Sequence, residues 1–219
     1  VWNNKIFKHI RMHVDRASKK LSNERGSCPD AEEYGFKERF SNKTAIAPTA
    51  SISIICGGAS PGIEPIAANS YTHKTLSGSY NVRNKYLQKI LEKHDKNNDE
   101  TWSTITTNQG SVRHLDFLTE HEKDVFKTAF EIDQKWIVEL GADRTPYISQ
   151  AQSVNIFLPA DVHKKELHQI HFQAWKKGLK SLYYCRSKSI QRAENINSGS
   201  TTDVELNVYK NKENQDPEY

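Results

Sequence analysis

Two adjacent tyrosines, Tyr183 and Tyr184, are the residues of this sequence best suited to redox chemistry. A tyrosine can give up one electron, and it loses its phenolic proton when it does so. Two neighbouring phenols could therefore relay an oxidised state from one to the other. The simpler interpretation is that both rings pack in a β-strand, where aromatic residues are common. Neighbours in a regular strand also point to opposite faces, so stacked rings there require a local distortion.

A second candidate is a run of small and hydroxyl-bearing residues, Pro48-Thr-Ala-Ser-Ile-Ser53, which is followed by the glycine-rich stretch 57–65. A ligand can come close to such a backbone, and its N–H groups can bind phosphate oxygens, especially beside a helix start. The pattern is neither a Walker loop nor G-x-G-x-x-G. Taken alone, it favours a buried strand with a few satisfied hydroxyls and a glycine turn.

The remaining candidates are metal ligands and thiols. Three histidines lie close together in the chain: His163, His168 and His171. No carboxylate or cysteine set completes a metal site around them, so we expect solvated or core histidines. The three cysteines are far apart and form no Cys-x-x-Cys pair: Cys28, Cys56 and Cys185. This argues against a disulfide scaffold and a zinc site, and favours reduced thiols in a cytoplasmic protein.

Composition excludes several classes of protein. The chain has 219 residues, of which 36% are hydrophobic and 26% charged, and its net charge is +4. This is ordinary for a globular protein with one sizeable core. Because there is no run of about 18 apolar residues, we expect no membrane span. The positive charge is spread along the chain without a dense basic block, so nucleic-acid binding is not expected.

The first half of the chain is predicted to contain helices around one extended segment. Apolar residues at helical spacing predict an amphipathic helix over 3–22. The β-branched, uncharged stretch 44–56 predicts a strand or a loop that enters one. A short helix is expected over 84–94. Thr119 with Glu122 fits a capping box that begins another helix.

The second half predicts a parallel α/β arrangement. After a helical segment around 133–140 that ends at Gly141, we expect a strand at 153–158, a helix and a second strand at 179–184. Asp161 is the expected helix cap, and Gly178 the expected end. One helix face should carry Leu167, Ile170, Ala174 and Trp175. From about 193 to 219 the sequence is polar and predicts a flexible tail.

Three segments together resemble class I ribonucleotide reductase large subunits, in that family's order: 23–29 (NERGSCP), 47–53 with 62–65 (APTASIS, GIEP), and 152–157 through 171–184 (QSVNIF, HFQAWKKGLKSLYY). The last segment is the most specific. The resemblance implies an α/β fold in which residues 1–192 supply later strands and helices of the family's ten-stranded barrel, followed by the tail at 193–219.

The resemblance also implies roles for the two candidate sites. It implies that Thr49, Ala50, Ser51, Ile52 and Ser53 hold the diphosphate of a ribonucleoside diphosphate. Many relatives carry a hydroxyl where Ile52 stands, but a backbone N–H can serve there. It implies that Tyr183 and Tyr184 pass a radical from a small, metal-containing subunit towards an active-site cysteine. No cofactor bound by this chain itself is implied.

Several parts of the family pattern have no match in this sequence. None of the three cysteines matches the family's radical cysteine or its reducing cysteines. We therefore expect a piece of a larger subunit, a truncated or split product that is inactive alone. The implied partners are the N-terminal part of the large subunit, the small subunit, and thioredoxin or glutaredoxin as the dithiol reductant. The alternative is a non-catalytic nucleotide-binding or assembly module that keeps the fold, although such a module would be free to lose both tyrosines.

Overall fold

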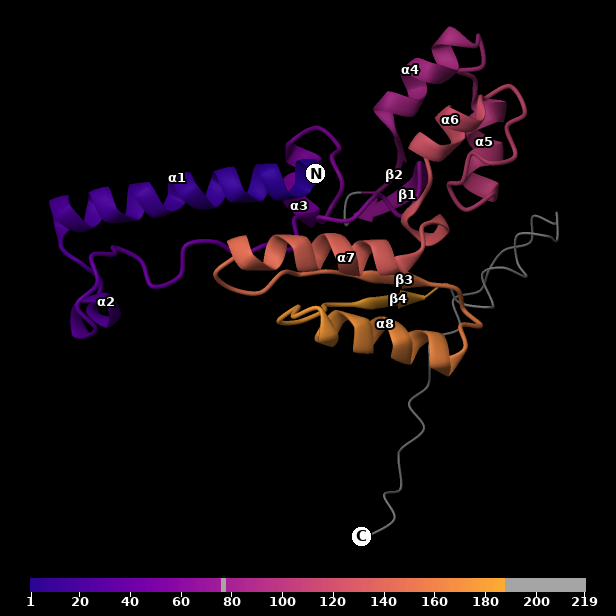
Figure 1. Cartoon of the computed structure of the whole chain (residues 1–219). Helices are drawn as coiled ribbons and strands as arrows, with labels where there is room; N and C mark the ends of the chain where they lie inside the picture. The colour runs from indigo at the N-terminus through magenta and orange to yellow at the C-terminus, as the bar shows by residue number, and fades with distance from the viewer. Residues whose placement is uncertain (76–77, 188–219) are drawn as a thin grey trace, which may run out of the picture.

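The computed structural model describes residues 1–75 and 78–187, and Figure 1 shows how its helices and strands are arranged. The predicted tail at 193–219 lies outside the described residues. Within the described residues no helix is long and apolar enough to cross a bilayer. The strands form two separate two-stranded sheets, β1–β2 and β3–β4. The described part of the chain therefore shows mixed α/β structure without a closed barrel.

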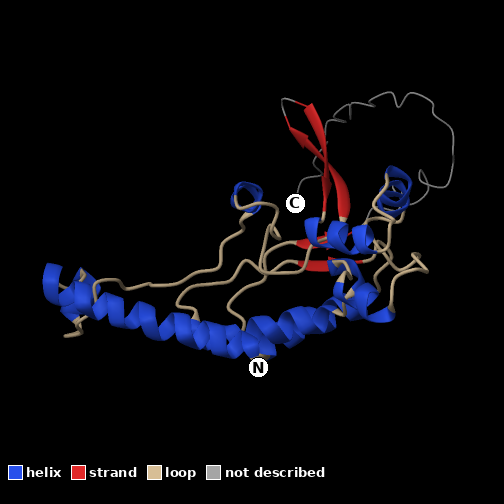
Figure 2. Cartoon of the chain, turned by 90° about the horizontal axis from the view of Figure 1, so that it is seen from above, coloured by secondary structure: helices blue, strands red, loops and turns tan. Residues whose placement is uncertain are grey.

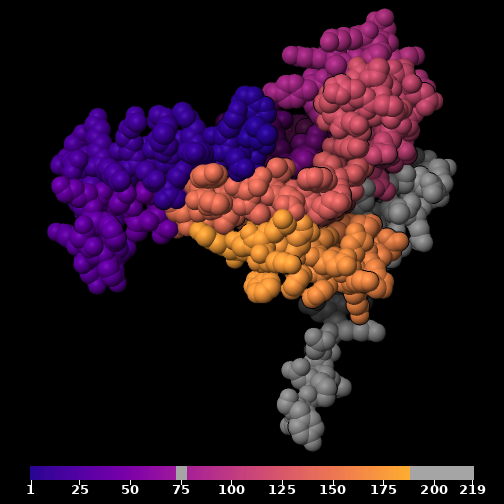
Figure 3. Space-filling view, in the orientation of Figure 1, coloured from indigo at the N-terminus to yellow at the C-terminus, as the bar shows by residue number. Residues whose placement is uncertain are grey.

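The N-terminal helix α1 (Trp2–Arg25) is confirmed and is the longest element. Figure 2 shows that most of it extends away from the rest of the molecule. Its first turns contact the end of α7 (Gln134–Arg144), where the Asn3 side chain donates to the Leu140 carbonyl at 3.0 Å. The short helix α2 (Pro29–Glu33) lies near its far end, and the two form a projecting arm in Figure 3.

The segment 44–56 was predicted to be extended, and this is wrong for its second half. Only Ile46 forms a bridge, with Gln152, and helix α3 (Ala50–Ile55) follows. β-Branched residues favour strands only where a neighbouring strand can pair with them. Here hydrogen bonds within the segment favour a helix, since Ser53 donates its backbone N–H to the Thr49 carbonyl and its hydroxyl to the Ala50 carbonyl.

The helical lobe, which we define as residues 84–126, has its own core. It contains α4 (Lys85–Lys93), α5 (Asp99–Thr107) and α6 (Glu120–Val125). Its buried side chains form one cluster: Leu87, Leu91, Trp102, Ile105, Val112, Leu115, Leu118 and Phe126. The predicted helix at 84–94 and the Thr119–Glu122 capping box are both confirmed. The antiparallel hairpin of β1 (Ser70–Thr75) and β2 (Gly78–Arg83) precedes the lobe and is visible in Figure 2.

The sheet unit, which we define as residues 134–187, carries the parallel arrangement that was predicted. Strands β3 (Ile156–Leu158) and β4 (Cys185–Ser187) pair in parallel, and the chain between them contains α8 (Lys164–Lys176). Figure 1 shows the two strands between α7 and α8. Their shared core contains side chains of α7, β3 and α8: Val138, Ile156, Leu158, Ile170 and Ala174. Two 3-10 turns, Ala129–Glu131 and Thr145–Tyr147, flank α7.

Helix α7 does not end at Gly141 as predicted but runs on to Arg144. Gly141 serves close packing instead of termination, because a Cβ there would lie 3.1 Å from Leu179 Cδ2. The helix gives way to a 3-10 turn at Thr145-Pro146, where proline lacks an N–H for the helical pattern.

Three details of the α8 region also differ from the prediction. The cap of α8 is His163, whose Nδ1 accepts from the Lys165 N–H at 3.1 Å, and not Asp161, which lies too far upstream. Trp175 is 72% exposed, because one step along the helix from buried Ala174 turns it off the core face. The final strand begins at Cys185 and not at 179. Gly178 does follow the helix end, with φ of 79°.

Candidate functional site

The two tyrosine side chains lie against each other immediately before β4. Their ring centroids are 4.1 Å apart, the rings are tilted by 51°, and the Tyr183 hydroxyl donates to the Tyr184 hydroxyl at 3.4 Å. They are 46% and 53% exposed, so neither ring is a core residue. This arrangement differs from that of neighbours in a regular strand, whose side chains diverge.

The backbone explains how neighbouring rings reach the same side. The Tyr183 N–H donates to the Val154 carbonyl at 2.8 Å, and the Ile156 N–H donates to the Tyr184 carbonyl at 2.9 Å. In a regular parallel ladder, both bonds would involve a single residue facing Asn155. Two residues facing one is the arrangement of a β-bulge, which re-aims side chains and is found beside active sites. The local distortion required by the sequence argument is therefore present.

The surroundings of the pair favour the protonated form of Tyr183. The hydrogen bond to Tyr184, and then that neighbour's electrostatic effect, raise the pKa of Tyr183 above its usual value, while the charge of Arg186 opposes this. The Arg186 guanidinium lies over the Tyr184 ring, 5.5 Å from its centroid. Sequence reasoning did not single out this arginine, although its position two residues after the pair was a usable signal.

The segment Thr49–Ser53 forms the start of α3 and not a strand. Its Ala50, Ser51 and Ile52 N–H groups belong to the first turn, which has no preceding helical carbonyls to bind. The Ser51 side chain is exposed, and Ile52 is 58% exposed.

The two ends of this segment are already engaged. The Thr49 N–H donates to the Pro61 carbonyl at 2.9 Å, and the buried Ser53 hydroxyl donates to the Ala50 carbonyl at 2.7 Å. The groups with open access are therefore at 50–52, in the middle of the predicted set.

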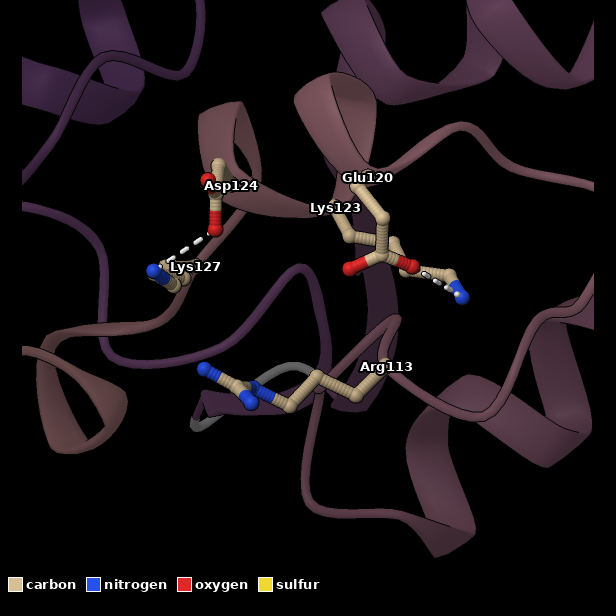
Figure 4. A pocket seen from close by; sticks show the side chains of 5 residues that line it. All are labelled: Arg113, Glu120, Lys123, Asp124 and Lys127. Atoms are coloured by element: carbon tan, nitrogen blue, oxygen red, sulfur yellow. Dashed lines mark hydrogen bonds and ion pairs between the residues drawn. The ribbon is translucent and has the colours of Figure 1, made fainter.

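A shallow hollow in the described residues lies away from both candidate segments. It has a volume of about 110 Å³ and is lined by charged residues of the helical lobe and its surroundings: Arg113, Glu120, Lys123, Asp124 and Lys127. Figure 4 shows its cations beside carboxylates, with Lys123 3.0 Å from Glu120 and Lys127 2.7 Å from Asp124. Arg113 pairs with Glu131 at 3.2 Å. These charges are balanced locally, which leaves no surplus to attract an anion.

The histidines have local roles in α8. His163 caps the helix, and the His168 ring stacks on Phe172 with centroids 6.0 Å apart. The Nδ1 of His171 lies 2.8 Å from the Leu167 carbonyl. Among the described residues, no group of three or more potential ligands could hold a metal ion. The three cysteines are free thiols, and Cys56 and Cys185 are exposed.

Two buried residues join the candidate segments and were not assigned roles from sequence. Glu64 is 6% exposed, and its carboxylate accepts the backbone N–H of Asn155. The Asn155 side-chain oxygen accepts the Tyr184 N–H at 3.3 Å. Both residues lie within the stretches on which the resemblance rests, but only the three-dimensional contacts connect them with the tyrosines.

Comparison with known proteins agrees with the resemblance. Residues 30–185 match the family model described as ribonucleotide reductase, barrel domain. The large subunit of ribonucleoside-diphosphate reductase from Invertebrate iridescent virus 6 is 50% identical over 197 residues, which cover 88% of this chain and 20% of that subunit. The corresponding subunit of Invertebrate iridescent virus 3 is 44% identical over 203 residues, covering 91% of this chain and 32% of that subunit.

A solved structure gives the same result. The class Id ribonucleotide reductase alpha subunit from Actinobacillus ureae superposes with a TM-score of 0.78 at 36% identity, over 88% of this chain and 35% of that one. This chain thus spans only about a fifth to a third of the length of these relatives. Because the family model covers most of the sequence, the chain belongs to the ribonucleotide reductase large-subunit family and represents part of its barrel domain.

Proposed function

We propose that this chain takes part in the reduction of ribonucleoside diphosphates to deoxyribonucleoside diphosphates by radical chemistry. Its contribution is a tyrosine relay at Tyr183 and Tyr184 and a diphosphate-binding segment at Thr49–Ser53. The observation that carries the proposal is the direct contact of two partly exposed phenol groups, 3.4 Å between oxygens, at a bulge that brings the rings together.

The relay is a balanced exchange between the two phenols. When one tyrosine has been oxidised to its neutral radical, it takes one electron and one proton from its neighbour. The first becomes a phenol again, and the neighbour becomes the radical. The ordinary tyrosine pKa of about 10 already keeps the phenol protonated near neutral pH until the electron leaves, and the rise in the pKa of Tyr183 acts in the same direction.

The phosphate-binding proposal rests on the first turn of α3 and its neighbours. Diphosphate oxygens would accept from the N–H groups of Ala50, Ser51 and Ile52 and from the exposed Ser51 hydroxyl. The five-residue segment contains no carboxylate that would repel a phosphate. Thr49 and Ser53 would fix the two ends of the turn through the bonds described above.

This function needs partners with the missing chemistry. They are the remaining part of the large subunit with its reactive cysteines, a small metal-containing subunit that generates the radical, and a dithiol protein such as thioredoxin or glutaredoxin. None of Cys28, Cys56 and Cys185 lies in a matching motif, so we expect no turnover from this chain alone.

The relay is tested by Tyr183→Phe and Tyr184→Phe in the assembled enzyme. Phenylalanine keeps the ring but has no phenolic proton to transfer, so each variant should abolish deoxyribonucleotide formation. Each should cost at most about 1 kcal/mol of unfolding free energy, since only one partly exposed hydroxyl is lost. Turnover and thermal unfolding should be measured on the same preparations. Two active variants would show that the pair serves packing alone.

The phosphate segment is tested by Ser51→Asp. A carboxylate about 4 Å from a phosphate charge costs on the order of 4 kcal/mol at an effective dielectric constant of about 20. Nucleoside diphosphate affinity, measured by calorimetry, should fall at least a hundredfold while binding of the small subunit is retained. Ser51→Ala is the matched control and should have a much smaller effect. Equal affinity in the Asp variant and the unaltered enzyme would refute this assignment.

A further inference from the structure

The bulge at the tyrosine pair creates a specific requirement for a hydrogen-bond acceptor. The ladder uses the Tyr183 N–H and the Tyr184 carbonyl, so the Tyr184 N–H has no carbonyl of the neighbouring strand to bind. Asn155, the residue that faces the bulge, supplies the acceptor: its side-chain oxygen lies 3.3 Å from the Tyr184 nitrogen. Asn155 is 8% exposed, so this amide is part of the folded interior.

Asn155 is in turn held by Glu64. The backbone N–H of Asn155 points away from β4, because its neighbours Val154 and Ile156 make the ladder bonds, and the Glu64 carboxylate accepts it. The carboxylate folds back over its own loop, where a Cβ on Gly62 would overlap it. The nearby charge of Arg144, itself 5% exposed, attracts Glu64 in this buried setting.

The loop that carries Glu64 also reaches the proposed phosphate segment. The Pro61 carbonyl accepts the Thr49 N–H at 2.9 Å, and the Ser60 hydroxyl donates to the Glu64 carbonyl at 2.6 Å. A short series of contacts therefore joins the start of α3 to the backbone of Tyr184. Its members are the backbones of Thr49 and Pro61 and the side chains of Glu64 and Asn155.

We propose that Glu64 and Asn155 are positioning residues that set the backbone of Tyr184 and tie the tyrosine pair to the Thr49–Ser53 segment. The inference rests on the proposed function, in which these two segments are the relay and the substrate-binding turn. Neither residue exchanges an electron or a proton in the reaction. Their effect is on the distance and angle between the two phenols.

The position of Tyr184 can be read directly with 3-fluorotyrosine placed at position 184 of the full chain and ¹⁹F NMR. Asn155→Ala removes the acceptor of the Tyr184 N–H and should shift or broaden the resonance. Gln134→Ala is the matched control, because buried Gln134 likewise accepts a β3 backbone N–H, that of Phe157 at 2.8 Å. It should destabilise the chain without moving the signal. An unchanged resonance in Asn155→Ala, or an equal shift in Gln134→Ala, overturns the proposal.

The same variants should separate rate from binding in the assembled enzyme. Misplacing a reacting group by about 1 Å can cost about a hundredfold in rate, so Asn155→Ala should lower kcat by about tenfold to a hundredfold with KM for CDP little changed. Glu64→Ala should lower kcat and also raise KM, because it releases the loop that holds Thr49. A fall in kcat no larger than that of Gln134→Ala would contradict a positioning role.

A double variant keeps the test decisive if the single variants fold poorly. Glu64→Gln combined with Asn155→Asp exchanges the carboxylate and the amide between the two positions. Each position therefore keeps an oxygen that can accept its hydrogen bond. It should recover most of the rate and the ¹⁹F position, and a variant that folds but recovers neither overturns the proposal. Turnover and the ¹⁹F signal also test the relay and the positioning role separately. If Tyr184→Phe proves active, the relay is wrong, yet the ¹⁹F comparison still decides whether Asn155 positions Tyr184.

Discussion

Asn69 lies at the base of the helical lobe and Asn155 at the entrance of the β3–β4 ladder, and both are buried. The Asn69 amide donates to the Gly110 and Phe126 carbonyls at 2.9 and 2.7 Å, and its oxygen accepts from the Asn84 side chain at 2.9 Å. All these partners belong to the lobe itself. The partners of Asn155 are instead Tyr184, which belongs to the candidate tyrosine pair, and Glu64, whose loop contacts the Thr49–Ser53 segment.

This difference shows that a buried asparagine can have two different structural roles. In the helical lobe, a buried amide joins the ends of helices around a core that is already complete. In the sheet unit, the amide compensates for an irregularity that places two rings side by side. We therefore expect changes in the lobe to affect stability first, and changes around Asn155 to affect rate first.

The largest expected effect on stability comes from Trp102→Ala in the lobe. Trp102 is 2% exposed and lies in the main lobe cluster, so truncation should cost about 3–5 kcal/mol of unfolding free energy. Chemical denaturation followed by circular dichroism measures this cost. Hydrogen exchange sharpens the comparison, because the Ile156 amide should stay protected when lobe amides do not. Equal loss of protection would mean that the two regions unfold as one unit.

A smaller cost is expected from Asn69→Ala, at about 3 kcal/mol. The change leaves the Phe126 carbonyl and the Asn84 side-chain amide without their Asn69 partner, and each such loss costs about 1–3 kcal/mol, whereas the Gly110 carbonyl keeps the Asn69 backbone N–H at 3.1 Å. In the assembled enzyme kcat should be nearly unaltered at a temperature where the variant is folded, in contrast to Asn155→Ala. A kcat loss as large as that of Asn155→Ala would remove the distinction between the two asparagines.

The smallest expected effect concerns Glu122 in the capping box of α6. The Thr119 backbone N–H, and then its hydroxyl, hold the pKa of Glu122 below its usual 4.5. Because the folded pKa is depressed, the stabilisation is complete above the unfolded pKa and is lost as pH falls through the folded value. The Tm advantage over Glu122→Gln should therefore shrink as the pH falls below the usual glutamate pKa of 4.5 and through the lower folded pKa of Glu122. Glu120→Gln is the control, because it leaves the Thr119–Glu122 box intact and should therefore retain the pH dependence that the box causes.

Some elements that depend on contacts between residues close in the chain were predicted correctly, whereas others that depend on distant residues were not. The Thr119–Glu122 box and α4 depend on bonds within a few residues, and both were predicted correctly. Helix α3 was missed because its β-branched composition suggests a strand, and the decision depends on whether a partner strand is available. The end of α7 was missed because Gly141 makes room for Leu179, a contact that no local pattern reveals.

The candidate site likewise has residues that the sequence could indicate and features that only the folded structure reveals. Tyr183 and Tyr184 could be named from sequence because of their chemistry, and the need for a distortion between them could be stated. The bulge itself could not be predicted, since it depends on pairing with residues about thirty positions earlier. Glu64 and Asn155 stand 91 residues apart, and their contact exists only in the folded chain.

The bulge also determines which genetic changes this region can accept. It adds one residue to the strand that enters β4, and the register after it places Cys185 opposite Ile156. Deleting a single residue between Gly178 and Tyr183 could be absorbed by the connecting loop, whereas deleting Tyr183 or Tyr184 would restore a regular ladder that carries only one phenol. A library of single-residue deletions across 178–187 should therefore show a narrow intolerant interval at the tyrosines, bounded upstream by a tolerant one.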